Sequence, residues 1–427
     1  MRILKHLSLY TFVGFLGAGI NFFLLPYLSH FIEPSEYGIL SLINTYVTIL
    51  IPLVGLVASG IISVEYYRMN DKEEFKKLFS SVQLIPIVPG VLFFLISLAI
   101  PGTISRGLEI PIDKSYWIPL SVLIAFFSIY YESLLAFTVA QQKPVTYVLF
   151  NILRLGIDIP LTVLLVTQTK YGWEGRLMAW FISSGLLTTV AFYYFRKEKL
   201  MTKKISWQYM KLGILFGLPL ILHTVGKFII NQADRLFIAK LVSLDEAGIY
   251  NIGYQVGMIM LFFVTAAGNY IYPYLNERLA SLNEAKKKDI VKLTYTILGF
   301  FLVLMFCISV AAPFFFKLLV DPKYAGGVKF VFWVALSYFF WGVYMVFAGY
   351  LYYAKKTRFL GNIALLNVVV NLVMNYFLIK QFGAIGAAYA TCISFFIFSV
   401  LVFAKANTLY KMPWLYFMKI KSIENEG

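Results

Sequence analysis

The sequence has few charges and almost no cysteine. Only 14% of its 427 residues are Asp, Glu, Lys or Arg, whereas 60% are apolar and the mean hydropathy is +0.77. A soluble protein could not cover itself with so little polar surface, so the composition predicts an integral membrane protein. The two cysteines, Cys307 and Cys392, both fall deep in apolar segments, which excludes a disulfide framework and a cysteine-based metal cluster. We expect neither a metal nor a cofactor.

The stretches between the apolar segments carry no catalytic motif. No nucleotide-binding loop, metal-ligand cluster or nucleophile triad occurs on any of them. A membrane polymerase that joins polysaccharide repeat units would carry a sizeable outer loop, whereas the longest outer loops here have about a dozen residues. We therefore do not expect an enzyme, and a polymerase is the least favoured function.

Apolar stretches of about 20 residues recur along the whole chain, and each could cross about 30 Å of hydrocarbon. We predict an all-α fold of twelve membrane-spanning helices with no separate soluble domain. Their ranges are 8–30, 37–64, 81–101, 115–140, 145–167, 175–195, 211–240, 247–275, 291–316, 328–353, 359–380 and 384–404. Arg2 and Lys5 precede the first range as in a signal peptide, but no small-x-small cleavage site follows, so we expect it to remain as helix 1.

The basic residues are distributed unevenly between the two sets of loops. The tails and the loops on their side hold 25 of the 37 Lys and Arg, and the opposite loops hold 9. The positive-inside rule then predicts that both termini lie in the cytoplasm. The net charge is +16, and the lysines and arginines that produce it lie at helix ends among aromatic residues. We therefore expect membrane lipids and not nucleic acid as its partners.

Landmarks in the first half recur in the second at offsets of 210 to 212 residues. The pairs are "SEYGIL" at 35–40 with "DEAGIY" at 245–250, Asn21 with Asn231, "AIP" ending at Pro101 with "AAP" ending at Pro313, and "YGWEG" at 171–175 with "FGAIG" at 382–386. We predict two six-helix repeats, 1–205 and 206–427, related by an axis along the membrane normal. Transporters built from repeats bind substrate between them near the bilayer midplane, so we expect polar groups to face a cleft there.

The predicted seventh helix carries ionisable groups. His223, Lys227, Asn231 and Asp234 follow at spacings of four, four and three, which places them on one face, with Arg235 beside its outer end. Placing a charged lysine in the bilayer costs about 3 kcal/mol of free energy. Lys227 must therefore face a water-filled space, pair with a carboxylate or lose its proton. Asp234 is about 10 Å away along the helix, too far for direct pairing. An ion pair that joins two helices is one interpretation, and a cation facing the cavity is the favoured one.

The predicted fifth helix supplies a second polar stripe of Asn151, Arg154 and Asp158 at spacings of three and four. At an offset of 213, Asn367 and Asn371 occupy the places of Arg154 and Asp158, and Asn375 continues the stripe. Glu132 on the preceding helix lies at a depth similar to that of Arg154. A structural Glu132–Arg154 pair is slightly favoured over direct contact with a substrate.

Smaller polar residues on the predicted eighth helix belong to the same expectation. Asn251 and Gln255 would line the cleft, although interhelical hydrogen bonds explain such residues equally well.

Two segments, "PLILHTVGKFIINQADRLFIAKLVSLDEAGIY" (219–250) and "YLSHFIEPSEYGILSL" (27–42), carry a family resemblance. They resemble the Wzx-like polysaccharide and O-antigen flippases of the multidrug/oligosaccharidyl-lipid/polysaccharide exporter (MOP) superfamily. The resemblance covers essentially the whole chain and implies a V-shaped, two-lobed helical bundle. It also implies that undecaprenyl-diphosphate-linked oligosaccharide is moved from the cytoplasmic to the periplasmic leaflet by alternating access, driven by an ion gradient. Lys227 and Arg154 would stand for the family's cavity cations and Asp234 for its acidic position.

Other branches of the superfamily match less well. Peptidoglycan-precursor flippases have two additional helices and arginines near helix 1, and residues 8–30 contain no arginine. Cation-coupled drug exporters of the MATE type would hold a carboxylate in the N-terminal cavity, and helix 1 has none. A MATE-type exporter remains the alternative function.

These arguments define the candidate site. The substrate-binding candidates are Lys227, Arg154, His223, Asn231, Arg235, Asn251 and Gln255. The ion-coupling candidates are Asp234, Asp158 and Glu132, with H⁺ or Na⁺ as the ion. The expected partners are a polyprenyl-diphosphate glycan, membrane lipids and the polysaccharide polymerase machinery. The glycan would end in O-antigen, capsule or exopolysaccharide.

Overall fold

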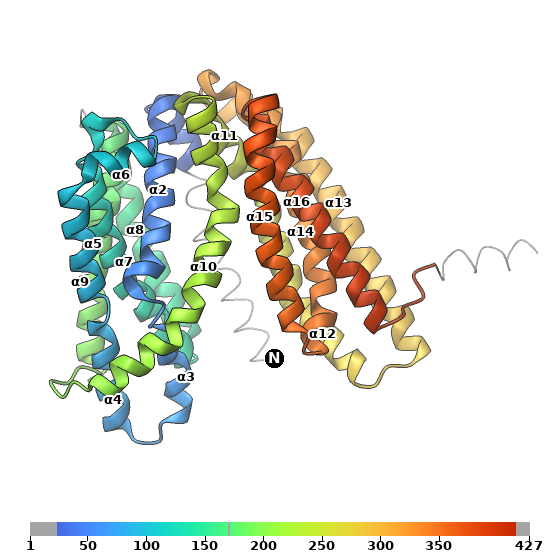
Figure 1. The fold of residues 1–427 in the computed structure, drawn as a ribbon, viewed down its shortest axis with the longest axis horizontal. Helices are drawn as coiled ribbons and strands as arrows, with labels where there is room; N and C mark the ends of the chain where they lie inside the picture. Colours follow the sequence, from blue (N-terminus) through green and yellow to red (C-terminus); the bar gives the residue numbers. More distant parts are fainter. Residues whose placement is uncertain (1–23, 170, 416–427) are drawn as a thin grey trace, which may run out of the picture. The chain divides into compact units, whose positions relative to one another are not determined.

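The computed structural model describes residues 24–169 and 171–415, except for the side chains of residues 222, 223 and 225–231. Every regular element in these ranges is a helix, as the sequence predicts (Figure 1). The elements up to the middle of the chain are α2 (Pro34–Gly55), α3 (Gly60–Arg68), α4 (Lys72–Leu84), α5 (Ile87–Ala99), α6 (Pro101–Gly107), η1 (Ile112–Lys114), α7 (Trp117–Ala140), α8 (Pro144–Thr167), α9 (Trp173–Lys197) and α10 (Trp207–Leu241). They are followed by α11 (Leu244–Gly257), α12 (Ile259–Ala280), α13 (Glu284–Leu319), η2 (Pro322–Gly327), α14 (Val328–Tyr353), α15 (Thr357–Phe382) and α16 (Ile385–Leu409).

Ten helical segments of the described chain are long and apolar enough to cross a membrane, so this is a multi-pass membrane protein. They coincide with ten of the twelve predicted spans. Of the other two, 8–30 falls largely outside the described residues, and 211–240 includes the side chains that are not described. The backbone of 211–240 lies within the single helix α10, which contains Pro219. The exact twelve-helix layout stays a prediction.

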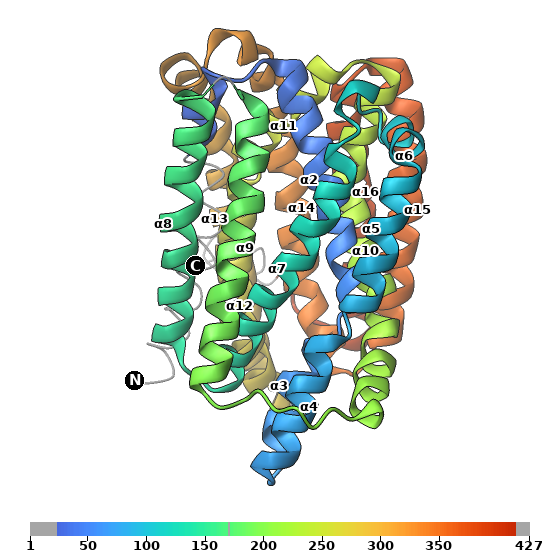
Figure 2. The ribbon, with the colours of Figure 1, turned by 90° about the vertical axis from the view of Figure 1, so that its left-hand side faces the viewer.

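The chain forms two compact units, Met1–Gly248 and Ile249–Gly427, here called unit 1 and unit 2. In unit 1, α7 packs against α2, α3, α5, α8 and α9 and is the central helix (Figures 1 and 2). In unit 2, α14 takes this place, packed against α12, α13, α15 and α16. Helix α10 belongs to unit 1 because it packs on α2, α3 and α4. The division into repeats at residue 205 stays a prediction.

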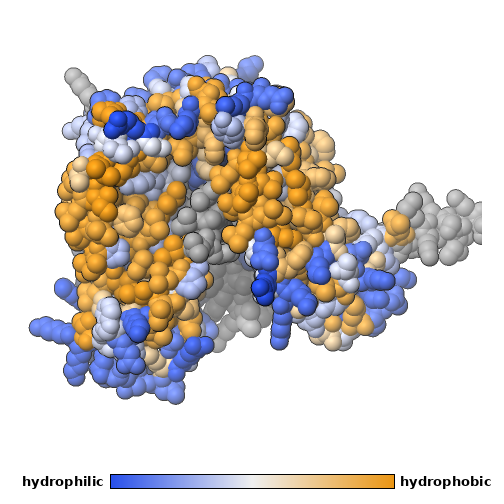
Figure 3. Space-filling model, viewed as in Figure 1, coloured by the Kyte–Doolittle hydropathy of each residue, from blue (hydrophilic) through white to orange (hydrophobic). Residues whose placement is uncertain are grey.

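Each unit exposes large apolar side chains along its length, which is the surface that hydrocarbon requires. On α13, for example, Val303 is 62% exposed, Val310 66% and Phe314 72%. Figure 3 shows such residues over the middle of each unit, with hydrophilic residues toward its ends. Inside unit 1, the rings of Phe79, Phe137 and Phe195 join α4, α7 and α9, with the Phe79 ring centre 4.9 Å from that of Phe195.

The turns "YGWEG" and "FGAIG" have the same geometry in the two units. Their first glycines, Gly172 and Gly383, have φ of 51° and 70°, which disfavours any residue with a Cβ. Their second glycines lie against the preceding helix. A Cβ on Gly175 would come 2.4 Å from the Leu165 carbonyl oxygen, and one on Gly386 would come 2.1 Å from that of Leu378. The aromatic-Gly-x-x-Gly motif therefore recurs because the same type of turn joins two antiparallel helices in each unit.

This packing predicts opposite effects for the same substitution at two positions of α9. Gly175→Ala should lower the free energy of unfolding by about 1–3 kcal/mol, because the new methyl group cannot avoid the Leu165 backbone. Gly185→Ala is the matched control, since a Cβ there meets nothing within 4 Å, and it should raise helix stability by up to about 1 kcal/mol. Thermal unfolding of the purified variants measures both. Equal melting temperatures would contradict the packing described here.

Candidate functional site

Helix α8 exposes a broad aliphatic side and, at the border of that side, Arg154. Val145, Leu149 and Ile152 are 59%, 60% and 48% exposed and lie on the aliphatic side, which Leu153 and Leu164 continue toward Arg154. Arg154 is also exposed, but it follows Ile152 by two residues and so points about 200° around the helix from it. The middle of the aliphatic side is the part best suited to lipid, and Arg154 is exposed outside it. It stands near the middle of the span, where a cation facing acyl chains would be costly.

Tyr131 on α7 forms a fixed platform for Arg154. The guanidinium carbon of Arg154 lies 5.7 Å from the centre of the Tyr131 ring, within the range of a cation–π interaction. Tyr131 is 4% exposed, and its hydroxyl donates a hydrogen bond of 3.0 Å to the carbonyl oxygen of Phe150. This arrangement holds the arginine in place without neutralising its charge, so the guanidinium N–H groups stay available for an anion.

Glu132 lies beside this platform. Along α7, Glu132 is exposed, and the other exposed residue, Val139, lies near the end of the helix. The structural pair favoured from the sequence is not found, because the described residues contain no Glu132–Arg154 ion pair and Arg154 lies over Tyr131 instead. We refer to Tyr131, Glu132 and Arg154 as the inner cluster of unit 1.

Asp158 has a different role from Arg154, although the two share a stripe. Its carboxylate Oδ1 accepts hydrogen bonds from Arg176 Nη1 at 2.9 Å and from Ser183 Oγ at 3.1 Å. Arg176 also donates to Thr162 Oγ1 at 3.0 Å. Asp158 is 8% exposed, so this network joins α8 to α9 within the membrane. From the sequence, Arg176 counts as an outer-loop cation, whereas the structure makes it the partner of this carboxylate.

In unit 2, the residues at the equivalent positions also connect two helices, but their side chains are uncharged. Asn371 Nδ2 lies 3.3 Å from Ser394 Oγ and 3.5 Å from Thr391 Oγ1, which joins α15 to α16. Asn375 Nδ2 donates to Asn371 Oδ1 at 2.9 Å. Asn371 follows Asp158 by 213 residues, and Ser394 follows Ser183 by 211. The two stripes are therefore corresponding interhelical connections, one ionic and one made of amides.

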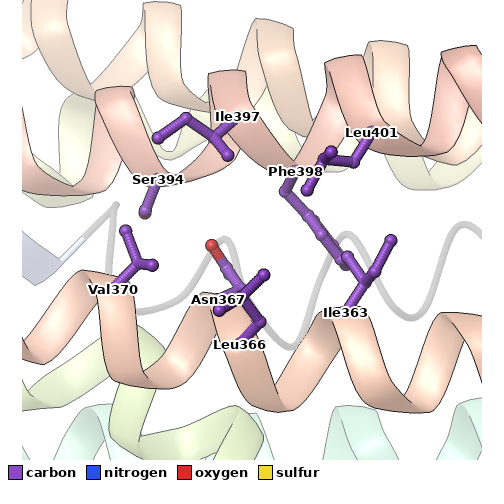
Figure 4. Close-up of a pocket in the computed structure, with 8 residues that line it drawn as sticks. All are labelled: Ile363, Leu366, Asn367, Val370, Ser394, Ile397, Phe398 and Leu401. Carbon is purple, nitrogen blue, oxygen red and sulfur yellow. The ribbon is translucent and has the colours of Figure 1, made fainter.

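A small groove lies between α15 and α16, one helical turn before Asn371 (Figure 4). The enclosed space is about 10 Å³, which is roughly enough for one water molecule, and Ile363, Val370 and Phe398 form part of its apolar wall. Asn367 also lines it and is 4% exposed. Neither polar atom of the Asn367 amide has a hydrogen-bond partner in the part of the chain that the structure describes. An unpaired buried amide is costly, so a hydrogen-bonding guest would stabilise this groove.

The candidate residues of α10 divide into two groups. The side chains of His223, Lys227 and Asn231 lie outside the described residues. Asp234 and Arg235 are 1% and 2% exposed, and Arg235 Nη1 donates a 2.7 Å hydrogen bond to Asp234 Oδ1. These two adjacent residues of α10 form a buried ion pair. Asn251 and Gln255 are half-buried on α11.

Comparison with known proteins identifies the family. The sequence model of the family described as "Polysaccharide biosynthesis protein" matches residues 3–279, well over half of the chain. The chain belongs to the polysaccharide biosynthesis protein family. The MatE family model matches residues 219–377 of this polysaccharide biosynthesis protein. The resemblance to Wzx-like flippases of the MOP superfamily is thereby confirmed.

Curated relatives of this polysaccharide biosynthesis protein include an "Uncharacterized membrane protein" of Haemophilus influenzae, 25% identical over 435 residues, which cover 100% of this chain and 99% of the relative. Another is the "Probable low-salt glycan biosynthesis flippase Agl15" of Haloferax volcanii, 20% identical over 54% of this chain and 49% of the relative. The first spans the same length as this chain, and the second carries a glycan-flippase name.

Two solved structures have the same fold. The lipid II flippase MurJ in an inward closed conformation aligns with a TM-score of 0.77 at 16% identity, over 94% of this chain and 87% of that one. A MATE family multidrug resistance transporter of the MOP superfamily, in an inward-facing conformation, aligns with a TM-score of 0.72 at 12% identity, over 93% and 94%. At such identities the likeness shows the fold alone.

Proposed function

We propose that this protein is a flippase for polyprenyl-diphosphate-linked oligosaccharides. It moves them by alternating access from the cytoplasmic to the periplasmic leaflet of a bacterial inner membrane, for synthesis of a cell-surface polysaccharide. Family membership supports the polysaccharide pathway. The observation that carries the proposal is Arg154, a cation exposed in the middle of a span and stacked on the buried ring of Tyr131.

These residues suit the transfer of a charged diphosphate across a membrane. A diphosphate with attached sugars cannot cross hydrocarbon unaided, because removing its charges from water costs many kcal/mol. A protein lowers this cost by offering fixed donors and cations in an accessible passage. Arg154, oriented by Tyr131, supplies a planar set of N–H groups that fits phosphate oxygens. In this proposal Lys227, His223 and Asn231 of α10 assist with the diphosphate, and Asn251 and Gln255 contact sugar hydroxyls.

The candidate carboxylates differ in what they already bind. Asp158 is occupied by Arg176, which joins α8 to α9, and Asp234 is paired with the adjacent Arg235. The same pairing makes Arg235 a structural residue in this proposal. Glu132 is exposed and is the carboxylate best placed to exchange H⁺ or Na⁺ with water. One charge crossing the membrane supplies about 2.3 kcal/mol per 100 mV, enough to drive accumulation of substrate.

Transport by proteoliposomes tests this proposal directly. The purified protein should make a polyprenyl-diphosphate glycan, added on one side, accessible to a membrane-impermeant lectin on the other. Glu132→Gln should abolish the acceleration by an ion gradient while equilibration without a gradient continues. Protein-free liposomes provide the baseline. If the protein-containing liposomes equilibrate the glycan no faster than that baseline, the flippase proposal is wrong.

Export of cationic drugs is the second candidate. Its support is the exposed carboxylate of Glu132, which suits a cation, together with a fold shared with MATE transporters. The same proteoliposomes separate the two functions: a drug exporter would concentrate a cationic dye and leave the glycan lipid where it was added. We expect glycan transport without dye accumulation.

A further inference from the structure

The exposed face of α12 does not resemble a surface made for lipid. Helix α12 packs against α13 and α14, and it lies within a membrane-spanning segment. Its exposed residues include no leucine, isoleucine, valine or phenylalanine. They are Thr265, Asn269, Tyr270, Pro273, Asn276, Glu277 and Ala280. Neighbouring α13, by contrast, exposes Val303, Val310 and Phe314. Of these, Thr265, Asn269, Tyr270 and Pro273 lie within the predicted span 247–275, where amides and hydroxyls are retained when they meet polar groups.

An aromatic and cationic ladder borders this face. Tyr270, Tyr274 and Arg278 are spaced by four residues, so they stack along one side of α12. The ring centres of Tyr270 and Tyr274 are 6.0 Å apart, and the guanidinium carbon of Arg278 lies 3.7 Å from the centre of the Tyr274 ring. Tyr270 is 59% exposed. One end of the ladder is therefore an accessible ring and the other is an oriented guanidinium.

Arg278 is held in place, but its guanidinium group is not fully hydrogen-bonded. Its Nε lies 3.9 Å from Asp289 Oδ2, and that nitrogen makes no hydrogen bond within the described chain. The Asp289 side chain is itself 55% exposed, so this contact is weak in water. A guanidinium stacked on an aromatic ring keeps its edge N–H groups available, and phosphate oxygens fit that edge.

We propose that α12 carries the loading site for the substrate, a claim that rests on the proposed flippase function. Arg278 binds the diphosphate, and the ring of Tyr270, with Asn269 and Asn276, binds the first pyranose sugars. The ladder ends where α12 meets the α12–α13 connection, the end that the basic residues place in the cytoplasm (Figure 1). Polyprenyl-diphosphate glycans arrive from that leaflet. Arg154 of unit 1 then acts later, at mid-span depth.

The chemistry of the ligand follows from the side chains. Aromatic faces stack on the C–H faces of pyranose rings, while amides exchange hydrogen bonds with ring hydroxyls. Tyrosines near a membrane surface also serve as lipid anchors. An anchor belt faces acyl chains, however, whereas the exposed neighbours of Tyr270 include the amide of Asn269. An ordinary phospholipid would satisfy Arg278 but would leave the sugar-binding groups unused.

Binding of two probes to the full-length protein in nanodiscs tests this proposal. One probe is undecaprenyl diphosphate, and the other is undecaprenyl diphosphate carrying a single hexosamine. Arg278→Gln should weaken both by about tenfold or more, since it removes a charge-assisted contact to phosphate. Tyr270→Leu should weaken only the sugar-bearing probe, and Tyr270→Phe should restore it. Phe306→Leu on α13 is the matched control, because Phe306 is 53% exposed on the apolar side, and it should change neither.

The outcomes separate this inference from the proposed function. If the wild-type protein binds neither probe above the level of a phosphatidylglycerol competitor, the flippase proposal fails and the loading site fails with it. If the wild-type protein binds both probes but Tyr270→Leu and Arg278→Gln bind as it does, only the loading site is wrong. Arg278→Lys keeps the charge without the planar fork and should recover part of the affinity. Should Arg278→Gln fold poorly, the pair Tyr270→Leu and Tyr270→Phe decides.

Discussion

Replacing Arg154 with alanine is expected to slow transport of a polyprenyl-diphosphate glycan by about 10- to 100-fold, because a charge-assisted contact to the diphosphate is worth about 1.5–3 kcal/mol. The folded protein should be little affected, since Arg154 is exposed and its described contact is the stacking on Tyr131. Proteoliposome transport per folded molecule is the measurement.

Two variants control the Arg154 experiment. Arg154→Lys retains the charge and should keep intermediate activity, because an ammonium cannot reproduce the planar contact. Arg106→Ala removes an exposed arginine on α6, whose Nε donates to the Gly102 carbonyl of its own helix, and transport should not change. An Arg154→Ala variant as active as Arg106→Ala would remove Arg154 from the site.

Replacing Asp158 with alanine is expected to cost about 3–5 kcal/mol of stability, because it breaks a buried ion pair. The Arg176 side chain is 18% exposed and would be left with an uncompensated charge inside the membrane. The double variant Asp158→Ala/Arg176→Gln should recover most of this loss. Thermal unfolding in detergent measures both variants.

The same variants decide the role of Asp158. Transport per folded molecule should survive in the double variant if the Asp158–Arg176 pair only joins two helices, as the proposed function assigns. Asp158→Asn reproduces the amide that Asn371 supplies in unit 2 and should be milder than alanine. Loss of gradient-driven transport in a stably folded double variant would instead restore Asp158 as an ion-coupling residue.

Much of the helical organisation was predictable because the membrane imposes it. Hydrophobic length alone located ten of the spans, and the paired glycine landmarks marked equivalent turns. The sequence did not indicate that the second span is interrupted between α2 and α3, where Leu56 and Val57 have φ of 49° and 50°. Both residues disfavour this conformation, so tertiary packing imposes it. A Cβ on Gly217 of α10 would lie 1.8 Å from the Leu56 carbonyl oxygen, which shows how closely the two backbones approach.

The polar stripes were predictable as stripes, but their partners were not. Spacing placed Arg154 and Asp158 near one another on α8, yet one is exposed and the other is paired with Arg176. The difference depends on how α9 is rotated against α8, which no local pattern encodes. The role of Glu132 was unresolved for the same reason, since the exposure of a residue on a buried central helix is a tertiary property. The polar face of α12 could have been found from the unusual frequency of amides and tyrosines around 265–278.

Water accessibility along α8 tests the central claim most directly. In a background of Cys307→Ser and Cys392→Ser, Arg154→Cys and Ile152→Cys place single thiols on opposite sides of this helix at similar depth. The inner cluster predicts that a charged methanethiosulfonate reagent modifies position 154 rapidly, that a polyprenyl-diphosphate glycan slows this reaction, and that position 152 stays unreactive. A position 154 as unreactive as position 152 would contradict the account.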